Sequence, residues 1–165
     1  MQSRIDRGTS FTFDVPLAVG LPATAGGRPA PEPARAAMAG LTALCIDNDA
    51  KILAGMQALL GGWGCEVITA SSGREALRLL RKDGEIPDVL LVDYHLDEGN
   101  GLSAITDIRW KYGPDLPAVL ITADRSQDVR DAAANSGVRV LHKPLKPAAL
   151  RALVSQLSVQ RPAAE

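Results

Sequence analysis

Five short aliphatic runs, which recur at regular intervals from Leu41 onward, constrain the fold of this chain most strongly. Segments with helical periodicity separate each run from the next. The runs are TALCI (42–46), EVITA (66–70), DVLLV (88–92), AVLIT (118–122) and VRVLH (138–142). Strands that alternate with helices form parallel sheets through right-handed crossovers. The sequence therefore predicts an α/β domain at residues 41–160, a doubly wound (βα)5 unit with a five-stranded parallel sheet.

The segments between the runs carry the capping and periodicity signals of helices. Ser72 and Glu75 are spaced as a capping box. Pro147 suits the first turn of the last helix, and a further helix is predicted near 126–135, where the apolar face is mostly alanine. In the first helix we expect one stripe to face the core and a row of alanines to line another face. The stripe is Ile52, Leu53, Met56, Leu59 and Leu60, and the alanines are Ala50, Ala54 and Ala58.

The first 40 residues differ in composition from the predicted domain. Residues 19–40 are rich in Pro, Ala and Gly and have too little apolar surface to offset their ordering entropy, so they are predicted to form a linker. Within residues 1–18, Phe11, Phe13 and Val15 alternate with polar residues, which is a strand pattern. Residues 161–165 are predicted to be a short tail.

Charge and cysteine content exclude several classes of protein. The chain has 18 Lys and Arg against 19 Asp and Glu, so it lacks the positive charge of a nucleic-acid or polybasic membrane-surface binder. It has neither an apolar run near the length of a membrane span nor a signal peptide. Cys45 and Cys65 should lie toward opposite edges of the sheet as unpaired core thiols. We therefore expect a cytoplasmic protein that contacts neither nucleic acid nor membrane.

Reactive side chains stand at four of the five predicted strand ends. Asp47, Asn48 and Asp49 follow the first strand, Asp93 ends the third, Thr122 ends the fourth and Lys143 follows the fifth. In an open parallel sheet these ends meet at one edge, where ligands bind. Carboxylates gathered there repel one another unless a cation joins them, and Mg²⁺ suits one or two carboxylates, water and a phosphate oxygen. An Asp beside Mg²⁺ can attack phosphorus, while an ammonium and a hydroxyl share the charge on the transferring oxygens.

Four motifs at these strand ends resemble the receiver domain of two-component response regulators. They are IDND, LLVDYHLDEGNG, LITAD and LHKPLKP. The resemblance covers about residues 41–160 and implies a flavodoxin-like sheet with strand order 2-1-3-4-5. It also implies phosphoryl transfer to Asp93 from a phosphohistidine, carried by a histidine kinase dimerisation domain or a histidine phosphotransfer protein.

The resemblance assigns roles to the residues at the same edge. Mg²⁺ would be held by the first-loop residues Asp47 and Asn48, by Asp93 and by the backbone carbonyl of His95, with Asp49 as a further candidate ligand. Thr122 and Lys143 would bind the phosphoryl group, and the Lys143–Pro144 peptide bond is expected to be cis. His95 and Asp124 would border the site and influence the lifetime of the phosphoryl group.

The chain departs from the family pattern at two positions. Asn48 replaces the second of two consecutive acids, and an amide is a weaker Mg²⁺ ligand than a carboxylate. Val140 occupies the position of an aromatic switch residue, three before Lys143. Any output signal through Thr122 and the last strand must therefore use a different side chain.

The N-terminal segment suggests a parent protein. SRIDRGTSFTFDVPLA (3–18) resembles the last turn and strand of a histidine kinase ATP-binding domain. A receiver that follows such a strand through a Pro/Ala linker has the layout of a hybrid histidine kinase. No DNA-binding segment follows the last predicted helix, so we expect the output to be a partner protein, a phosphotransfer domain or the parent kinase.

Two functions from other classes compete with a phosphoacceptor receiver. Asn48 motivates the first, a pseudo-receiver that binds proteins and no longer takes phosphate. The second is a small phosphatase or phosphotransferase with an aspartyl nucleophile. Such enzymes carry a second acid two residues after the nucleophile, and here that position is His95.

Overall fold

A five-stranded parallel sheet forms the centre of the structure, a computed structural model that describes residues 2–4, 8–10 and 38–159. The strands are β3 (Thr42–Ile46), β4 (Glu66–Ala70), β5 (Val89–Asp93), β6 (Ala118–Thr122) and β7 (Arg139–His142). The helices are α2 (Ala50–Gly61), α3 (Gly73–Asp83), α4 (Gly101–Tyr112), α5 (Gln127–Asn135) and α6 (Pro147–Val159). The sheet order is β4-β3-β5-β6-β7, so the predicted (βα)5 fold with strand order 2-1-3-4-5 is confirmed.

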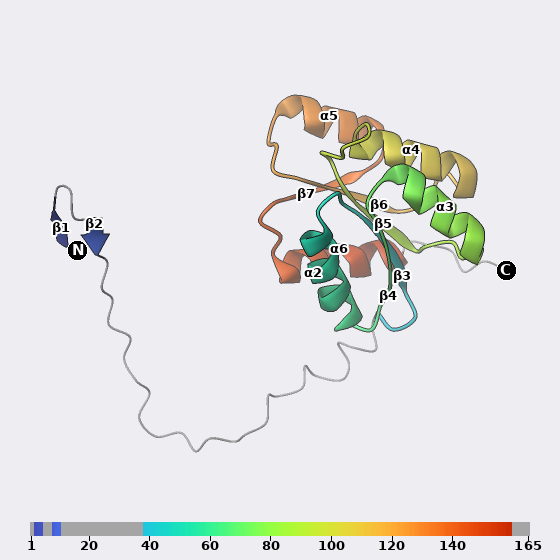
Figure 1. Cartoon of the computed structure of the whole chain (residues 1–165). Helices are drawn as coiled ribbons and strands as arrows, with labels where there is room; N and C mark the ends of the chain where they lie inside the picture. Colours follow the sequence, from blue (N-terminus) through green and yellow to red (C-terminus); the bar gives the residue numbers. More distant parts are fainter. Residues whose placement is uncertain (1, 5–7, 11–37, 160–165) are drawn as a thin grey trace, which may run out of the picture.

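Helices cover both faces of the sheet, which explains why the strands are apolar at consecutive positions. Helices α2 and α6 lie on one face and α3, α4 and α5 on the other (Figure 1). Alternate residues of each strand point to opposite faces. In β5, Val89 and Leu91 join the core with α2 and α6, whereas Leu90 and Val92 join the core with the other three helices. The two cores hold the strand ends in fixed positions.

Polar caps begin four of the helices at the ends of the loops that follow the strands. Asp49, Ser72, Asn100 and Ser126 each accept a hydrogen bond from a backbone amide in the first turn of the helix that follows. Such caps satisfy amides that have no partner within the helix. The helix predicted near 126–135 is present as α5. The short loops place each cap close to the carboxyl edge of the sheet.

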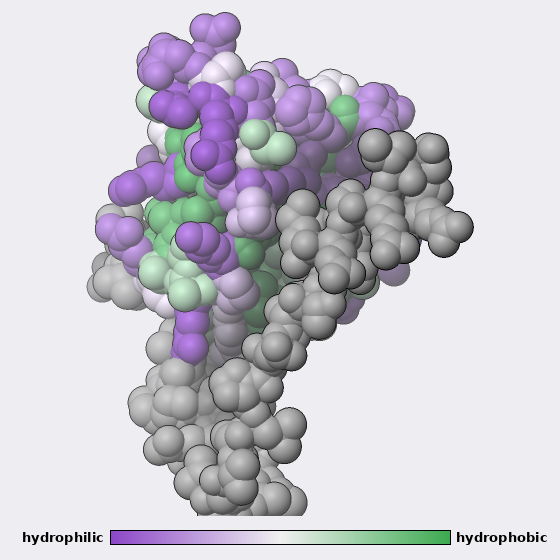
Figure 2. Space-filling model, turned by 90° about the vertical axis from the view of Figure 1, so that its left-hand side faces the viewer, coloured by the Kyte–Doolittle hydropathy of each residue, from purple (hydrophilic) through white to green (hydrophobic). Residues whose placement is uncertain are grey.

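The predicted inward stripe of α2 is partly wrong. Met56 and Leu60 are buried, but Ile52 is 37% exposed. The stripe spans a wider arc of the helix than the sheet and α6 can cover, so its first member reaches the surface. Figure 2, which looks onto the left-hand side of Figure 1, shows hydrophobic residues surfacing among hydrophilic ones on the side where α2 lies.

The N-terminal expectations mostly fall outside the described residues. The predicted strand with Phe11, Phe13 and Val15, most of the 19–40 linker and the 161–165 tail are among the parts that the structure does not describe. Before them, β1 (Gln2–Arg4) pairs antiparallel with β2 (Gly8–Ser10). Met38, which composition assigns to the linker, is fully buried in the core beside α2 and α6.

Two further expectations bear on the class of protein. Cys45 and Cys65 are free, buried thiols, as predicted, and burial raises the pKa of Cys45 to about 12. This makes the Cys45 thiolate, the reactive form, scarce at neutral pH. Among the helices of residues 38–159, none combines the length and the hydropathy needed to cross a membrane.

Two glycines should respond in opposite ways to the same substitution. A Cβ at Gly101, the first residue of α4, would overlap the backbone carbonyl oxygen of Asp93, so Gly101→Ala should lower the free energy of unfolding by about 1–3 kcal/mol. A Cβ at Gly55, in the middle of α2, meets nothing within 4 Å, so Gly55→Ala should raise it by about 0.5–1 kcal/mol. Urea denaturation of the two variants measures both changes, and equal effects would contradict the close approach of α4 to Asp93.

Candidate functional site

Four strand ends bring their polar side chains to one edge of the sheet. Asp47 follows β3, Asp93 is the last residue of β5, Thr122 is the last of β6 and Lys143 follows β7. Asp47 and Asp93 are 6% and 5% exposed, and Thr122 is fully buried. Carboxylates are rarely buried without a partner, because burial costs them their hydration. The edge therefore contains a compact, charged site beneath the surface.

Lys143 joins the two buried carboxylates. Its Nζ lies 2.7 Å from Asp93 Oδ1 and 3.4 Å from Asp47 Oδ2. Partial burial alone would lower the pKa of Lys143, but the hydrogen bond and charge of Asp93, together with the charge of Asp47, outweigh it and raise that pKa above its usual value. The lysine is therefore an ammonium ion at neutral pH. One positive charge faces two negative ones.

The backbone around Lys143 is held against β6. The Lys143 amide donates to the carbonyl of Thr122 at 2.9 Å, which continues the ladder between β6 and β7 by one residue. The Lys143–Pro144 peptide bond is cis, as the resemblance implied.

The same type of local hydrogen bond, from a backbone amide to a side-chain oxygen, orients three of the four functional side chains. Asp47 Oδ1, Asp93 Oδ2 and Thr122 Oγ1 each accept a hydrogen bond from the backbone amide two residues further on, at 2.9–3.0 Å. Asp and Thr favour such turns because their short side chains reach the amide at i+2. Each bond occupies one oxygen and sets the direction of the side chain. Asp47 and Asp93 thus keep their other carboxylate oxygens toward Lys143.

The remaining first-loop residues point elsewhere. The Asp49 carboxylate accepts from the Lys51 amide at 2.8 Å and caps α2. Asn48 Nδ2 donates to Asp97 Oδ1 at 2.6 Å. Asp97, four residues after Asp93, is a partner that the sequence analysis did not identify, since hydrogen bonds between two loops leave no periodic signal.

The site's charge balance suits a magnesium ion. Among the described residues, no three His, Cys, Asp or Glu side chains converge as a ready-made cage for a metal ion. Mg²⁺ does not need such a cage, because it keeps several waters and binds through one or two carboxylates. Asp47 and Asp93 supply two buried carboxylates, and Lys143 neutralises one charge. The donor set therefore fits Mg²⁺ better than a metal that requires three or four protein ligands.

His95 and Asp124 lie at the border of the site. His95 is exposed, and its amide is the donor to Asp93 Oδ2. Hydrogen bonds from Ser126 lower the pKa of the Asp124 carboxyl, and the nearby imidazoles of His95 and His142 contribute in the same direction. Val140, at the position of the expected aromatic residue, packs against the core with α3, α4 and α5.

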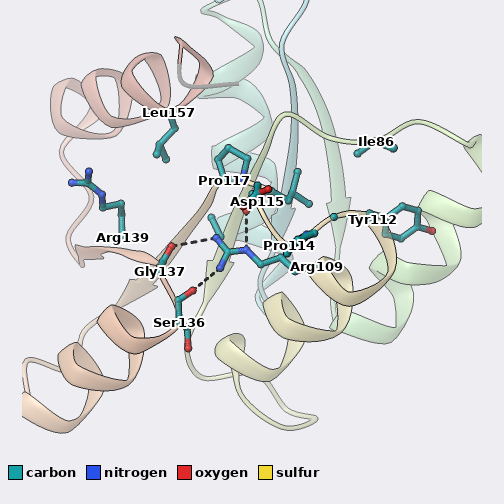
Figure 3. A pocket seen from close by; sticks show the side chains of 13 residues that line it. Ile86, Arg109, Tyr112, Pro114, Asp115, Pro117, Ser136, Gly137, Arg139 and Leu157 are labelled. Atoms are coloured by element: carbon teal, nitrogen blue, oxygen red, sulfur yellow. Dashed lines mark hydrogen bonds between the residues drawn. The ribbon is translucent and has the colours of Figure 1, made fainter. Parts of the chain in front are cut away.

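A second hollow lies away from these residues. It has a volume of about 580 Å³ and is lined by residues such as Ile86, Tyr112 and Leu157 (Figure 3). Arg109 spans it, donating to the backbone carbonyls of Leu116, Ser136 and Gly137. These bonds tie the end of α4 to the loop after α5. We assign Arg109 a bracing role, because its hydrogen-bonding fork is engaged by backbone oxygens.

Comparisons with known proteins agree with the architecture. Residues 43–155 match the family model described as the response regulator receiver domain. The chain is 34% identical over 103 residues to the transcriptional regulatory protein ZraR of Escherichia coli K12, which covers 62% of this chain and 23% of ZraR. It is 32% identical over 127 residues to an uncharacterized 14.6 kDa protein of Leptolyngbya boryana, which covers 76% of this chain and 95% of that protein.

Solved structures of receiver domains have the same fold as this chain. A response regulator receiver domain protein from Clostridium thermocellum superposes with a TM-score of 0.67 at 26% identity, covering 73% of this chain and 95% of that one. The chain spans only about a quarter of the length of transcriptional regulators such as ZraR, so the match concerns one domain of those proteins. The chain belongs to the family of response regulator receiver domains.

Proposed function

We propose that this domain accepts a phosphoryl group from a phosphohistidine onto Asp93, in a reaction that depends on Mg²⁺. The observation that carries the proposal is the buried group of Asp93, Asp47 and Lys143, in which the ammonium contacts both carboxylates. Thr122 stands at the end of the neighbouring strand with its hydroxyl fixed by the Asp124 amide. These are the residue types that phosphoryl transfer to a carboxylate requires.

In the transfer, the carboxylate of Asp93 attacks phosphorus, an O–P bond forms and the N–P bond of the phosphohistidine breaks. The electron pair of that bond stays on the departing imidazole, so the products are an aspartyl phosphate and histidine. The Lys143 ammonium and the Thr122 hydroxyl are placed to neutralise the oxygens of the phosphoryl group as it moves. Attack of water on the aspartyl phosphate releases phosphate and restores Asp93.

Mg²⁺, when bound, would neutralise the phosphoryl oxygens and the two carboxylates together. Asp47, Asn48, Asp93 and the carbonyl of His95 are the residues that would hold it. Asp49 is less suited, because its carboxylate already caps α2. Asn48 can contribute only its amide oxygen, because Mg²⁺ takes oxygen ligands and the amide nitrogen is a donor, which here donates to Asp97.

The wider context of the domain is part of the proposal. The resemblance of residues 3–18 to the end of a kinase ATP-binding domain favours a hybrid histidine kinase, whereas relatives such as ZraR are named as transcriptional regulators. Both arrangements deliver the phosphoryl group from a histidine on a kinase or a phosphotransfer protein. A cytoplasmic location stays a prediction from the sequence.

The partner that carries the phosphohistidine should dock on α2. Ala50, Ala54 and Ala58 are all exposed and, spaced four residues apart, lie along one side of the helix. This helix begins two residues after Asn48 and so borders the carboxyl edge of the sheet (Figure 1). Small apolar side chains allow a partner helix to approach closely. We propose that the donor helix packs here, which brings its histidine to Asp93.

Phosphorylation can be measured by intact mass. After incubation with acetyl phosphate and Mg²⁺, the wild-type chain should gain the mass of one phosphoryl group. Asp93→Asn should gain none, because an amide cannot act as the nucleophile. Asp128→Asn, which alters an exposed aspartate of α5, should behave as wild type.

A wild-type chain that gains no mass with acetyl phosphate, and none with a phosphorylated protein donor, would refute the proposed transfer. It would favour the pseudo-receiver, for which the replacement of an acid by Asn48 is the supporting feature. A phosphoryl group found on Asp93→Asn would place the acceptor elsewhere.

The docking face can be tested with a bulky charge. The donor in this test is a phosphorylated histidine phosphotransfer protein that transfers its phosphoryl group to the wild type. Ala54→Arg should slow this transfer about tenfold, because the guanidinium blocks close approach of the donor. A tenfold change corresponds to roughly 1.4 kcal/mol in the free energy of the transition state. Phosphorylation by acetyl phosphate should be unchanged, since a small donor needs no docking surface. Ala134→Arg, an exposed alanine on α5, is the control. Equal rates for Ala54→Arg and wild type with the protein donor would remove α2 as the docking face.

A further inference from the structure

A hydrogen bond between two loops accounts for the unusual Asn48. Nδ2 of Asn48, in the loop after β3, donates to Oδ1 of Asp97, in the loop after β5, at 2.6 Å. Charge-assisted hydrogen bonds to a carboxylate are stronger than neutral ones. Both side chains are exposed; Asn48 directly follows Asp47, and Asp97 lies four residues after Asp93. The bond therefore links the two loops that follow the buried carboxylates.

An amide is the side chain that this arrangement requires at position 48. It offers a donor on one branch and an acceptor on the other, whereas a carboxylate offers acceptors only. Because Nδ2 of Asn48 donates to Asp97, Oδ1 of Asn48 stays available for another partner such as a cation. An aspartate at 48 would instead place two carboxylates in contact, and the repulsion would push the two loops apart. Asn48 and Asp97 together carry one negative charge, the charge of the acid that Asn48 replaces.

The loop after β5 is held on its other side as well. Glu98 forms an ion pair with Arg74 of α3 at 3.4 Å, and the Gly101 amide donates to the Tyr94 carbonyl at 2.9 Å. These contacts fix the loop to α3 and to the start of α4. Toward the loop after β3, the side chains of this part of the structure make the Asn48–Asp97 bond. His95, whose carbonyl is a proposed ligand, lies within this loop.

We propose that Asp97 is a positioning residue for the Mg²⁺ site and that it acts through Asn48. By accepting from Nδ2, Asp97 selects the orientation of the amide in which Oδ1 serves as the metal ligand, and it holds the two ligand-bearing loops together. The proposal rests on the proposed function, because it assigns a role within the same site. Hydrogen-bonded partners of metal ligands commonly change metal affinity by tenfold or more when they are removed.

A double-mutant cycle tests whether Asp97 acts through Asn48. Mg²⁺ is titrated calorimetrically into the wild type, Asp97→Ala, Asn48→Ala and the double variant. Asp97→Ala should weaken Mg²⁺ binding by about fivefold to tenfold in the wild-type background and by less than about twofold in the Asn48→Ala background. Glu98→Ala is the matched control, because it removes a neighbouring charge of the same loop whose partner is Arg74. It should leave the Mg²⁺ affinity within about twofold of wild type.

A second readout needs no metal. In EDTA, amide hydrogen exchange at residues 95–99 should be several times faster in Asp97→Ala and in Asn48→Ala than in the wild type, and the double variant should be no faster than the faster single one. We expect this because the two single variants and the double variant all lose the same hydrogen bond between Asn48 and Asp97. Both residues are exposed loop positions, so the variants should keep the fold, which far-UV circular dichroism verifies.

The outcomes separate this inference from the proposed function. A wild type that binds no Mg²⁺ at millimolar concentration would overturn both. If the wild type binds Mg²⁺ and Asp97→Ala weakens binding equally in the two backgrounds, Asp97 acts by its charge alone, and the positioning role is wrong while the proposed function stands. Unchanged affinity and unchanged exchange in Asp97→Ala would also overturn the positioning role.

Discussion

The contact of Lys143 with both Asp93 and Asp47 is the interaction on which the rest of the site depends. Strand β5 lies two places from β7 in the sheet, and β3 lies three places from it. With neighbouring strands about 4.8 Å apart, only a long side chain can cross that interval. Lysine meets this requirement and supplies the charge that allows two carboxylates to remain buried.

The fold supports this contact through repetition of one local geometry. At the carboxyl end of each of β3, β5 and β6, an oxygen-bearing side chain accepts a hydrogen bond from the amide two residues later. The amides fix one oxygen of Asp47 and one of Asp93, and the other oxygens face the ammonium. The arrangement has a net negative charge, which is the basis for the proposed Mg²⁺ site. The proposed chemistry thus follows from backbone geometry as much as from residue identity.

The sequence was sufficient for the sheet and for the residues at its edge. The aliphatic runs marked each strand because strands buried on both faces must be apolar throughout. In an open parallel sheet the carboxyl ends of the strands meet at one edge, where ligands bind. The order of the strands therefore predicted that Asp93, Thr122 and Lys143 lie close together. Contacts between loops could not be predicted in this way, so the pairing of Asn48 with Asp97 appeared only in the structure. Ile52 was wrongly predicted to face the core. A helical stripe shows which residues of a helix are apolar, but it does not show how much of the helix surface the neighbouring elements cover.

The most direct test of the central contact is the thermal stability of Lys143→Met with and without Mg²⁺. In EDTA the variant should melt below the wild type, because Asp93 and Asp47 lose their cation. Millimolar Mg²⁺ should raise its melting temperature by more than that of the wild type, since the ion then supplies the missing charge. A variant that melts with the wild type in EDTA, or that Mg²⁺ does not stabilise, would contradict the account of a carboxylate pair balanced by Lys143 and completed by a divalent cation.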